Sequence, residues 1–181
     1  MKTLRKIILL LAGGLCLLNF LGCEVRTSAS LRTGPSFSLI GSGRLVSFRV
    51  YAPQPGHKIA NPYDESSLIW SIEPSRGHSE GALVNHMDIS YGTAPNGYTQ
   101  AVPSNGTTGS LSAGLVYYFS VETTGAPGTG DFFYMDKAAP IRIKIPDLCY
   151  AGGMKLLRCG TNEPFREPPD LEKYVREHQT P

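Results

Sequence analysis

The sequence predicts an all-β fold, an antiparallel two-sheet sandwich followed by a short C-terminal helix. Short segments rich in β-branched and aromatic residues alternate between apolar and polar positions, which is typical of half-buried strands. The 20 glycines and 14 prolines among 181 residues are concentrated in clusters between these segments, where turns are expected. A helical period first appears after residue 168. Frequent turns and short strands favour two packed sheets.

Eight segments are expected to form strands. Alternation places Phe48 and Val50 opposite Leu45 in the second segment, and Tyr117 and Phe119 on one face of the sixth. The eight expected strands are residues 37–40, 45–51, 68–72, 87–91, 98–102, 115–124, 131–135 and 140–145.

The seventh segment is apolar on both faces. Phe132 and Tyr134 share one face, and Phe133 and Met135 share the other. Because a solvated face would normally be polar, one of these faces is expected to be covered. A partner, a neighbouring strand or the C-terminal tail could cover it.

A short helix is expected from about Asp170 to Gln179. Leu171, Tyr174 and Val175 begin an i, i+3, i+4 pattern that marks one helical face. A helix of this length is marginal by itself. It therefore either docks on the sandwich or frays.

The N-terminus has the composition of a targeting segment. Lys2, Arg5 and Lys6 precede an apolar run of 16 residues, 7–22, that ends at Cys23. A membrane-spanning helix needs about 20 apolar residues, so an uncleaved anchor is the weaker interpretation.

These residues resemble a bacterial lipoprotein signal peptide. Leu21 and Gly22 fit the positions before the acylated cysteine, which is Cys23 here, whereas Phe20 replaces the usual aliphatic residue. The resemblance implies a signal peptide over 1–22 and a lipid-anchored mature chain beginning at Cys23. The alternative is an ordinary secretory signal that leaves Cys23 as a free thiol.

The resemblance also implies a compartment, the bacterial cell envelope. Asp directly after the lipidated cysteine retains such proteins at the inner membrane, and here Glu24 follows Cys23, so the outer membrane is favoured. Residues 23–36 are polar and are expected to form a flexible tether of about 20 Å.

Charge and cysteine content restrict the partners. Removal of the three N-terminal cations leaves fourteen Lys and Arg against fifteen Asp and Glu, so no basic stripe indicates nucleic acid.

Cys149 and Cys159 are expected to form a disulfide in an oxidising envelope, with two free thiols as the alternative. No CxxC pair is present, so neither a zinc site nor any other metal or cofactor is expected.

One segment resembles fibronectin type III domains. Leu111 stands six residues before Tyr117, which leads into an alternating strand, and Trp70 matches the tryptophan of an early strand. The resemblance covers roughly 37–135 and implies that Tyr117 is a buried corner residue whose hydroxyl bonds to nearby backbone. The sandwich domain is accordingly assigned to 37–146, with the disulfide loop and tail in 147–181.

The strand order predicts which loops meet. Loops 73–86, 103–110 and 125–130 are expected at one end of the sandwich, and loops 52–67 and 92–97 at the other.

A candidate binding loop lies at the first of these ends. It contains Arg76, His78, Glu80 and His86. The alternative is that these residues belong to a solvent-exposed connection with no binding role. Residues 77–81 also match G-x-S-x-G, the pattern of a hydrolase nucleophile. No strand–turn–helix pattern surrounds it, so an enzyme is not expected.

Together these features predict an envelope-anchored lipoprotein that acts as a non-catalytic interaction or structural module. Its expected partners are the membrane, through the N-terminal lipid, and another envelope protein or a surface polymer. The alternative function is a carbohydrate- or small-ligand-binding accessory lipoprotein. Exposed aromatic residues on a flat patch would favour the first function, and a pocket would favour the second.

Overall fold

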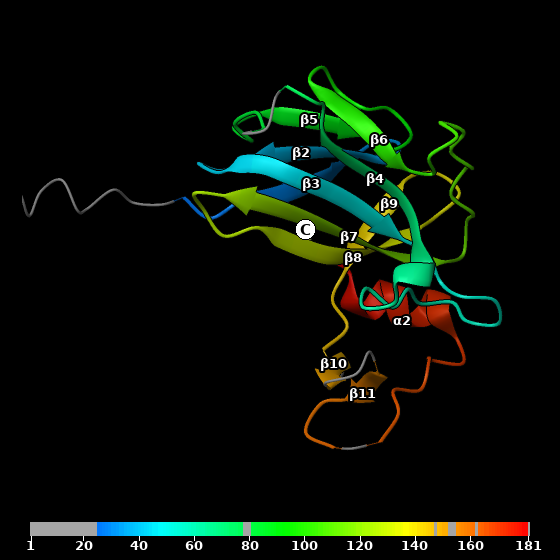
Figure 1. Cartoon of the computed structure of the whole chain (residues 1–181). Coiled ribbons are helices and arrows are strands. Elements are labelled where there is room, and N and C mark those ends of the chain that lie inside the picture. The colour runs from blue at the N-terminus through cyan, green and yellow to red at the C-terminus, as the bar shows by residue number, and fades with distance from the viewer. Residues whose placement is uncertain (1–24, 78–80, 147, 152–154, 162, 181) are drawn as a thin grey trace, which may run out of the picture.

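A computed structural model describes residues 25–77, 81–146, 148–151, 155–161 and 163–180. The described residues form eleven strands, one short 3-10 helix and one α-helix (Figure 1). In chain order these are β1 (Ser28–Arg32), β2 (Ser36–Ile40), β3 (Arg44–Tyr51), η1 (Glu65–Ser67), β4 (Leu68–Pro74), β5 (Met87–Ser90), β6 (Tyr98–Val102), β7 (Val116–Thr124), β8 (Thr129–Met135), β9 (Pro140–Ile143), β10 (Leu148–Ala151), β11 (Lys155–Arg158) and α2 (Leu171–His178).

Two antiparallel sheets form the sandwich, as predicted. The smaller sheet has the order β1-β2-β5 and the larger sheet the order β6-β4-β3-β7-β8-β9. A separate hairpin, β10-β11, lies in the C-terminal segment. All eight expected strands are present, and seven of their sixteen ends are shifted by one or two residues. The hairpin and β1 were not expected.

Aromatic rings fill the space between the two sheets. Phe37 of the small sheet is fully buried, and its ring centroid lies 4.8 Å from that of Phe48, 5.0 Å from that of Phe119 and 5.6 Å from that of Phe133. These three rings come from β3, β7 and β8 of the large sheet. One residue of β2 therefore joins the centre of the small sheet to three strands of the large one.

Leu45 differs from its expected position. Strict alternation would place it on the face opposite to Phe48, but Leu45 is fully buried in the same core cluster. The pairing of β3 with β7 shifts in register between Leu45 and Ser47. Because a bulge of this kind inserts one extra residue, it turns Leu45 inward.

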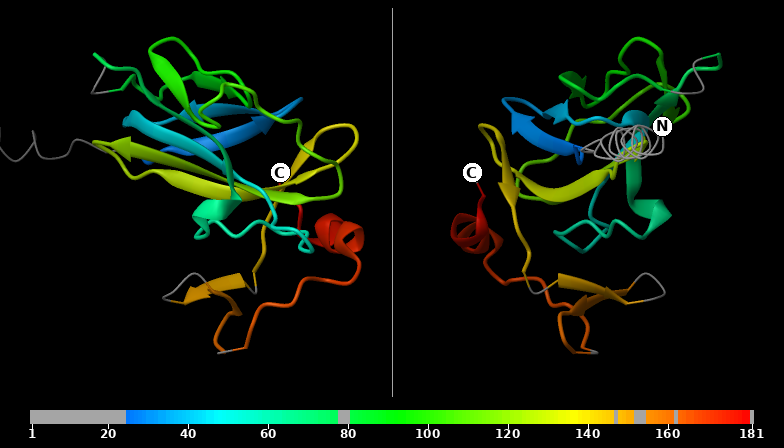
Figure 2. Two further views of the ribbon diagram at one scale, coloured as in Figure 1. Left: turned by 45° about the vertical axis from the view of Figure 1, so that its right-hand side comes forward. Right: turned by 90° about the vertical axis from the view of Figure 1, so that its left-hand side faces the viewer.

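A second core covers the outer face of the large sheet. Phe132 and Tyr134 of β8 are buried there with Leu171 and Val175 of α2, whereas Phe133 belongs to the core between the sheets. The C-terminal tail is therefore the element that covers the second apolar face of β8. Figure 2 shows the C-terminal segment as a third layer below the large sheet.

The expected helix is confirmed, and it docks rather than frays. The Asp170 side chain caps its N-terminus by accepting a hydrogen bond of 2.9 Å from the Lys173 N–H. After the helix, the Lys144 N–H donates to the His178 carbonyl at 3.0 Å, and the Thr180 N–H donates to the Arg142 carbonyl at 3.0 Å. These bonds attach the tail to the β9 side of the large sheet.

Tyr117 is the buried corner residue that the sequence predicts. Its side chain is 3 % exposed. Its hydroxyl accepts a hydrogen bond of 2.8 Å from the Ser112 N–H and lies 3.4 Å from the Ser112 carbonyl oxygen, to which it donates. These bonds fix the turn that leads into β7.

The flexible tether expected over 23–36 is wrong from Ser28 onward. Residues 28–32 form β1, which pairs with β2 along its whole length. Ala29 is buried, and the Thr27 N–H donates to the Pro127 carbonyl at 3.1 Å. A polar, small-residue sequence is tolerated here because β1 is an edge strand with one face outward.

The antiparallel strands define two ends of the sandwich. The N-terminal end comprises the turn 41–43 and the loops 75–77, 81–86 and 125–128, at the left of Figure 1. The far end comprises the loops 52–67, 103–115 and 136–139.

The expected grouping of the loops is wrong in two places. Residues 103–110 lie at the far end, because β6 runs antiparallel to β4 and carries the chain back. Residues 92–97 do not form a turn at one end but run between the two. Gly92 lies beside Thr108 at the far end, and the Ser75 N–H donates to the Gly97 carbonyl at 2.8 Å near the N-terminal end.

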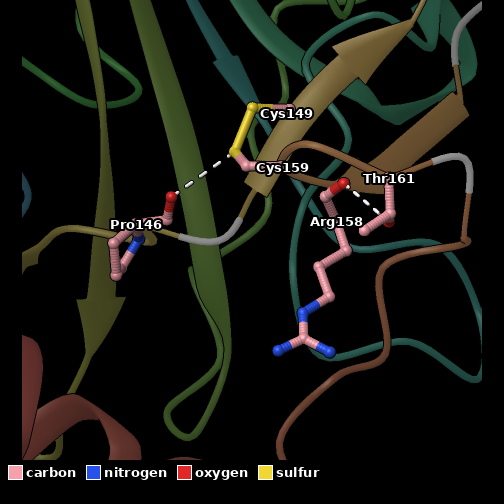
Figure 3. Close-up of a disulfide and its surroundings, with 5 residues drawn as sticks. All are labelled: Pro146, Cys149, Arg158, Cys159 and Thr161. Atoms are coloured by element: carbon pink, nitrogen blue, oxygen red, sulfur yellow. Dashed lines mark hydrogen bonds between the residues drawn. A yellow bond between two sulfur atoms is a disulfide. The ribbon is translucent and has the colours of Figure 1, made fainter.

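The predicted disulfide between Cys149 and Cys159 is present. The two Cα atoms are 4.8 Å apart, and the bridge joins β10 to the residue after β11 (Figure 3). The Cys159 Sγ lies 3.4 Å from the Pro146 carbonyl oxygen. This is a contact rather than a hydrogen bond, because a disulfide sulfur carries no proton.

Replacement of both Cys149 and Cys159 by Ser should loosen the hairpin locally. Loop closure across ten residues accounts for about 2–3 kcal/mol. We expect amide hydrogen exchange in β10 and β11 to accelerate, while amides of β3 and β7 keep their protection. A global loss of protection in β7 would show that the disulfide supports the sandwich itself.

Candidate functional site

Two of the four residues of the predicted binding loop can be placed. Arg76 and His86 are both exposed at the N-terminal end, and His86 has a positive φ of 58°. His78 and Glu80 lie outside the described residues. The described part of this loop is fixed to β3, because the Leu45 N–H donates to the Ala82 carbonyl at 2.9 Å. A binding role for these residues stays a prediction.

The surroundings of the G-x-S-x-G pattern differ from those of a hydrolase nucleophile. Gly77 and Gly81 flank residues that lie outside the described part of the chain. From Gly81 to His86 the described backbone forms an isolated bridge and a turn, not a helix. A helix after the serine would be needed to orient it and to supply an oxyanion-binding N–H.

Hollows of ≈ 210 to ≈ 430 Å³ occur at several places on the described part of the chain. One of them lies at the far end of the sandwich. Its volume is ≈ 420 Å³, within the range of roughly 300–1,000 Å³ of ligand pockets. We call it the Tyr91 hollow. Its lining comprises Pro35, Tyr91, Gly92, Thr108, Gly109, Ser110, Leu111 and Met135.

The back of the Tyr91 hollow is a fixed aromatic and amide network. The Tyr91 ring lies 5.4 Å from the buried Trp70 ring. The Trp70 indole N–H and the Thr108 hydroxyl both donate to the Gln100 Oε1, each at 3.0 Å. The Gln100 amide in turn donates to the Pro103 carbonyl at 2.9 Å. Gln100 therefore joins the core tryptophan to the loop that forms one wall.

The hydroxyl of Tyr91 stays protonated over the physiological range. Burial and, to a smaller extent, the neighbouring Tyr117 raise the pKa of Tyr91 to about 12. A neutral phenol can donate and accept one hydrogen bond each. The hollow thus presents a half-buried aromatic face with a polar tip beside the apolar Leu111 and Met135.

Two glycines keep the hollow open. Gly92 has a positive φ of 82°, which other residues rarely adopt. A Cβ at Gly109 would meet no atom within 4 Å, so the hollow opens to solvent on this side. A ligand backbone or ring can therefore approach this wall closely.

A smaller hollow of ≈ 210 Å³ lies where the 52–67 loop meets the C-terminal segment. The Glu167 carboxylate accepts hydrogen bonds from the Lys58 N–H at 2.9 and 3.0 Å and from the Ile59 N–H at 3.0 Å. The His57 Nδ1 lies 3.5 Å from the same carboxylate. The Glu167 carboxylate thus holds the 52–67 loop to the C-terminal segment. Because this structural role explains the acidic group, the Tyr91 hollow is the stronger candidate for a binding site.

Most of the aromatic residues in and next to the strands belong to the cores. Tyr98, Phe132, Phe133 and Tyr134 are buried. Tyr118 packs against the Phe132 ring at 4.9 Å, and burial raises its pKa to about 12. Of this set, Tyr91 lines the hollow at the far end, and Tyr134 lines another hollow beside the start of α2. The sequence contained a signal for this site in the Gly- and Thr-rich 103–110 loop, but not the distant pairing with Tyr91.

Comparison with protein families, with curated proteins and with solved structures found no match for this chain. Among the described residues, no three or more His, Cys, Asp and Glu side chains gather in a way that could hold a metal ion. The described helices include none with the length and apolarity needed to cross a membrane.

Proposed function

We propose that this chain is an envelope-anchored lipoprotein whose sandwich is a non-catalytic interaction module, with its binding site at the Tyr91 hollow. The basic start, the apolar run and the Leu21-Gly22-Cys23 junction support anchoring at Cys23. The outer membrane is the favoured location, because Glu24 rather than Asp follows Cys23. The Cys149–Cys159 disulfide agrees with an oxidising envelope.

The position of the hollow supports the binding role. The described chain begins at the N-terminal end, and the hollow lies at the far end, beyond the length of β7. Nine residues of a strand span roughly 30 Å. A partner could therefore reach the hollow without contacting the anchored end.

A Cys23→Ser variant tests the anchoring. Thioether attachment and acylation require the Cys23 sulfur, so we expect the variant to lose its acyl chains and to retain residues 1–22 or leave the membrane fraction. Intact mass spectrometry of protein made with its own N-terminus in a lipoprotein-processing bacterium measures this. The matched control is Cys16→Ser, which lies in the segment to be removed and should leave acylation unchanged. An unacylated mature N-terminus in the parent protein would exclude the proposal.

A Gly109→Arg variant tests the binding site. Because the position is open to solvent, the arginine should obstruct the hollow without straining the fold. A photo-crosslinking residue at Ser110 should give a discrete crosslinked protein in intact cells, and the Gly109→Arg change should reduce that product at least fivefold. Crosslinking from the exposed Thr99 of β6 is the control for non-specific capture. An equal yield from both positions would count against an interaction site here.

A small ligand or carbohydrate is the second candidate function. It is favoured by the concave shape of the hollow and by the single half-buried tyrosine ring beside hydroxyl groups. In that case, native mass spectrometry of the extracted protein should show a bound molecule of low mass that the Gly109→Arg variant lacks. The mass of the molecule bound in the hollow therefore distinguishes the two candidate functions: a protein supports the first and a molecule of low mass supports the second.

A further inference from the structure

The described chain begins in close attachment to the N-terminal end of the sandwich. The Val25 carbonyl accepts hydrogen bonds from both the N–H and the hydroxyl of Ser42, each at 3.2 Å. Two residues later, Thr27 is 2 % exposed, and its N–H is bonded to the Pro127 carbonyl. A Cβ on Gly41 would lie 2.8 Å from the Thr27 Cα, so this contact leaves no free space. Val25 is thus already part of the folded domain.

This attachment leaves almost no connection to Cys23. Cys23 and Val25 are two residues apart, so their Cα atoms can be separated by about 7 Å at most. The longer tether expected from the sequence would have allowed the domain to rotate freely above a membrane. A connection of two residues restricts this rotation, because about 7 Å of chain keeps the N-terminal end close to the anchor.

The surface around this attachment point is apolar and basic. Four large hydrophobic residues are exposed among the described residues, and three of them lie here: Val25 at 54 %, Ile40 at 45 % and Leu83 at 55 %. Ile40 is the last residue of β2 and pairs with Ser28, and Leu83 bridges to Arg44. The three side chains therefore belong to neighbouring segments of one end.

The charged residues of the same end are mostly cationic. The described segments 25–28, 40–45, 75–77, 81–87 and 124–129 contain the cations Arg26, Arg44 and Arg76 and no Asp or Glu. The exposed Asp88, one residue further along β5, lies 4.0 Å from the Arg32 guanidinium. Glu24 and Glu80 are next to these segments in the sequence and lie outside the described residues. Exposed apolar side chains among arginines suit the boundary between lipid headgroups and acyl chains.

We infer that the N-terminal end lies directly on the bilayer that holds the Cys23 lipid, with Val25, Ile40 and Leu83 in the headgroup region. This inference rests on the proposed lipidation of Cys23. It assigns the described residues 75–77 and 81–86 to a lipid surface rather than to a protein partner. It also points the Tyr91 hollow away from the membrane, at a height set by the length of the strands.

Collisional quenching can test this orientation in the full, acylated protein. Two variants that each add one free cysteine, Leu83→Cys at the N-terminal end and Ser110→Cys at the far end, are labelled with a small fluorophore. Cys149 and Cys159 do not react, because they are held in their disulfide. The labelled variants are reconstituted in vesicles of phosphatidylethanolamine and phosphatidylglycerol that carry a nitroxide in the headgroup region. We expect the Leu83→Cys probe to be quenched at least threefold more strongly than the Ser110→Cys probe. Asn85→Cys and Thr107→Cys, one at each end, should repeat the contrast.

An insertion of twelve Gly and Ser residues between Glu24 and Val25 is the control for the short connection. The insertion should lower quenching at Leu83→Cys to the level at Ser110→Cys. Undiminished quenching would contradict the role given to the short connection.

Mass spectrometry of the N-terminus separates the two proposals. If Cys23 carries no acyl chains, the proposed function fails and this inference fails with it. If Cys23 is acylated and the two ends are quenched equally, or the far end more strongly, the orientation alone is refuted.

Discussion

A Tyr117→Ala variant should lose much of the stability of the sandwich. The Tyr117 ring is buried, and its centroid lies 5.6 Å from that of Phe133 in a stacked arrangement. Removing a buried aromatic side chain costs about 3–5 kcal/mol, because the transfer free energy is lost and a cavity remains. At this chain length, that loss corresponds to a fall in Tm of roughly 10 °C or more. Differential scanning calorimetry measures the change.

A Tyr117→Phe variant separates the ring from the hydroxyl. It keeps the packing and loses the two hydrogen bonds to Ser112. Because Ser112 is exposed, water can replace part of what is lost, and a cost of about 1 kcal/mol is expected. If the Tm fell by the same amount in both variants, the hydrogen bonds of the hydroxyl rather than the packing of the ring would dominate the stabilisation. If neither melted below the parent, the assigned place of Tyr117 in the core would be wrong.

A Leu171→Ala, Val175→Ala double variant should release α2 from the large sheet. Leu171 is 4 % exposed and Val175 is 2 % exposed, and both pack in the second core with Phe132 and Tyr134. Truncating the two side chains should cost about 4 kcal/mol. An eight-residue helix is not stable without its packing, being shorter than the ~12–15 residues that isolated helices need. The helix should therefore unfold when it leaves the sheet.

Hydrogen exchange and dye binding report this release. Amides of α2 should lose their protection, and exposure of the Phe132 and Tyr134 face should increase binding of a hydrophobic dye. The exposed Lys173 lies on the same helix, so Lys173→Ala is the matched control and should change neither signal. Protection of α2 that survives in the double variant would mean that the backbone bonds at Lys144 and Thr180 hold the tail by themselves.

The alternation of residues determined most of the strands and both cores. Phe48, Val50, Phe119 and Phe133 occupy the faces that a period of two assigns to them. The double-sided pattern of β8 required a cover, and the tail contained an apolar helical stripe able to supply it. Tyr117 was also predictable, because its turn and strand are close in sequence. In each case the deciding interactions are local or follow directly from side-chain direction.

Only the tertiary structure decided the remaining features. The sequence of β1 has only a weak strand pattern. The strand forms because it pairs with the edge of β2, and because Gly41 has no side chain to block the close approach of Thr27. The inward turn of Leu45 depends on a bulge, which shifts the register by one residue and reverses the expected face. The Tyr91 hollow is lined by the residues that follow β5, by the 103–115 loop and by the end of β8. Those segments meet because β5 and β6 join different sheets, and a pattern read along the chain does not specify pairing between distant strands.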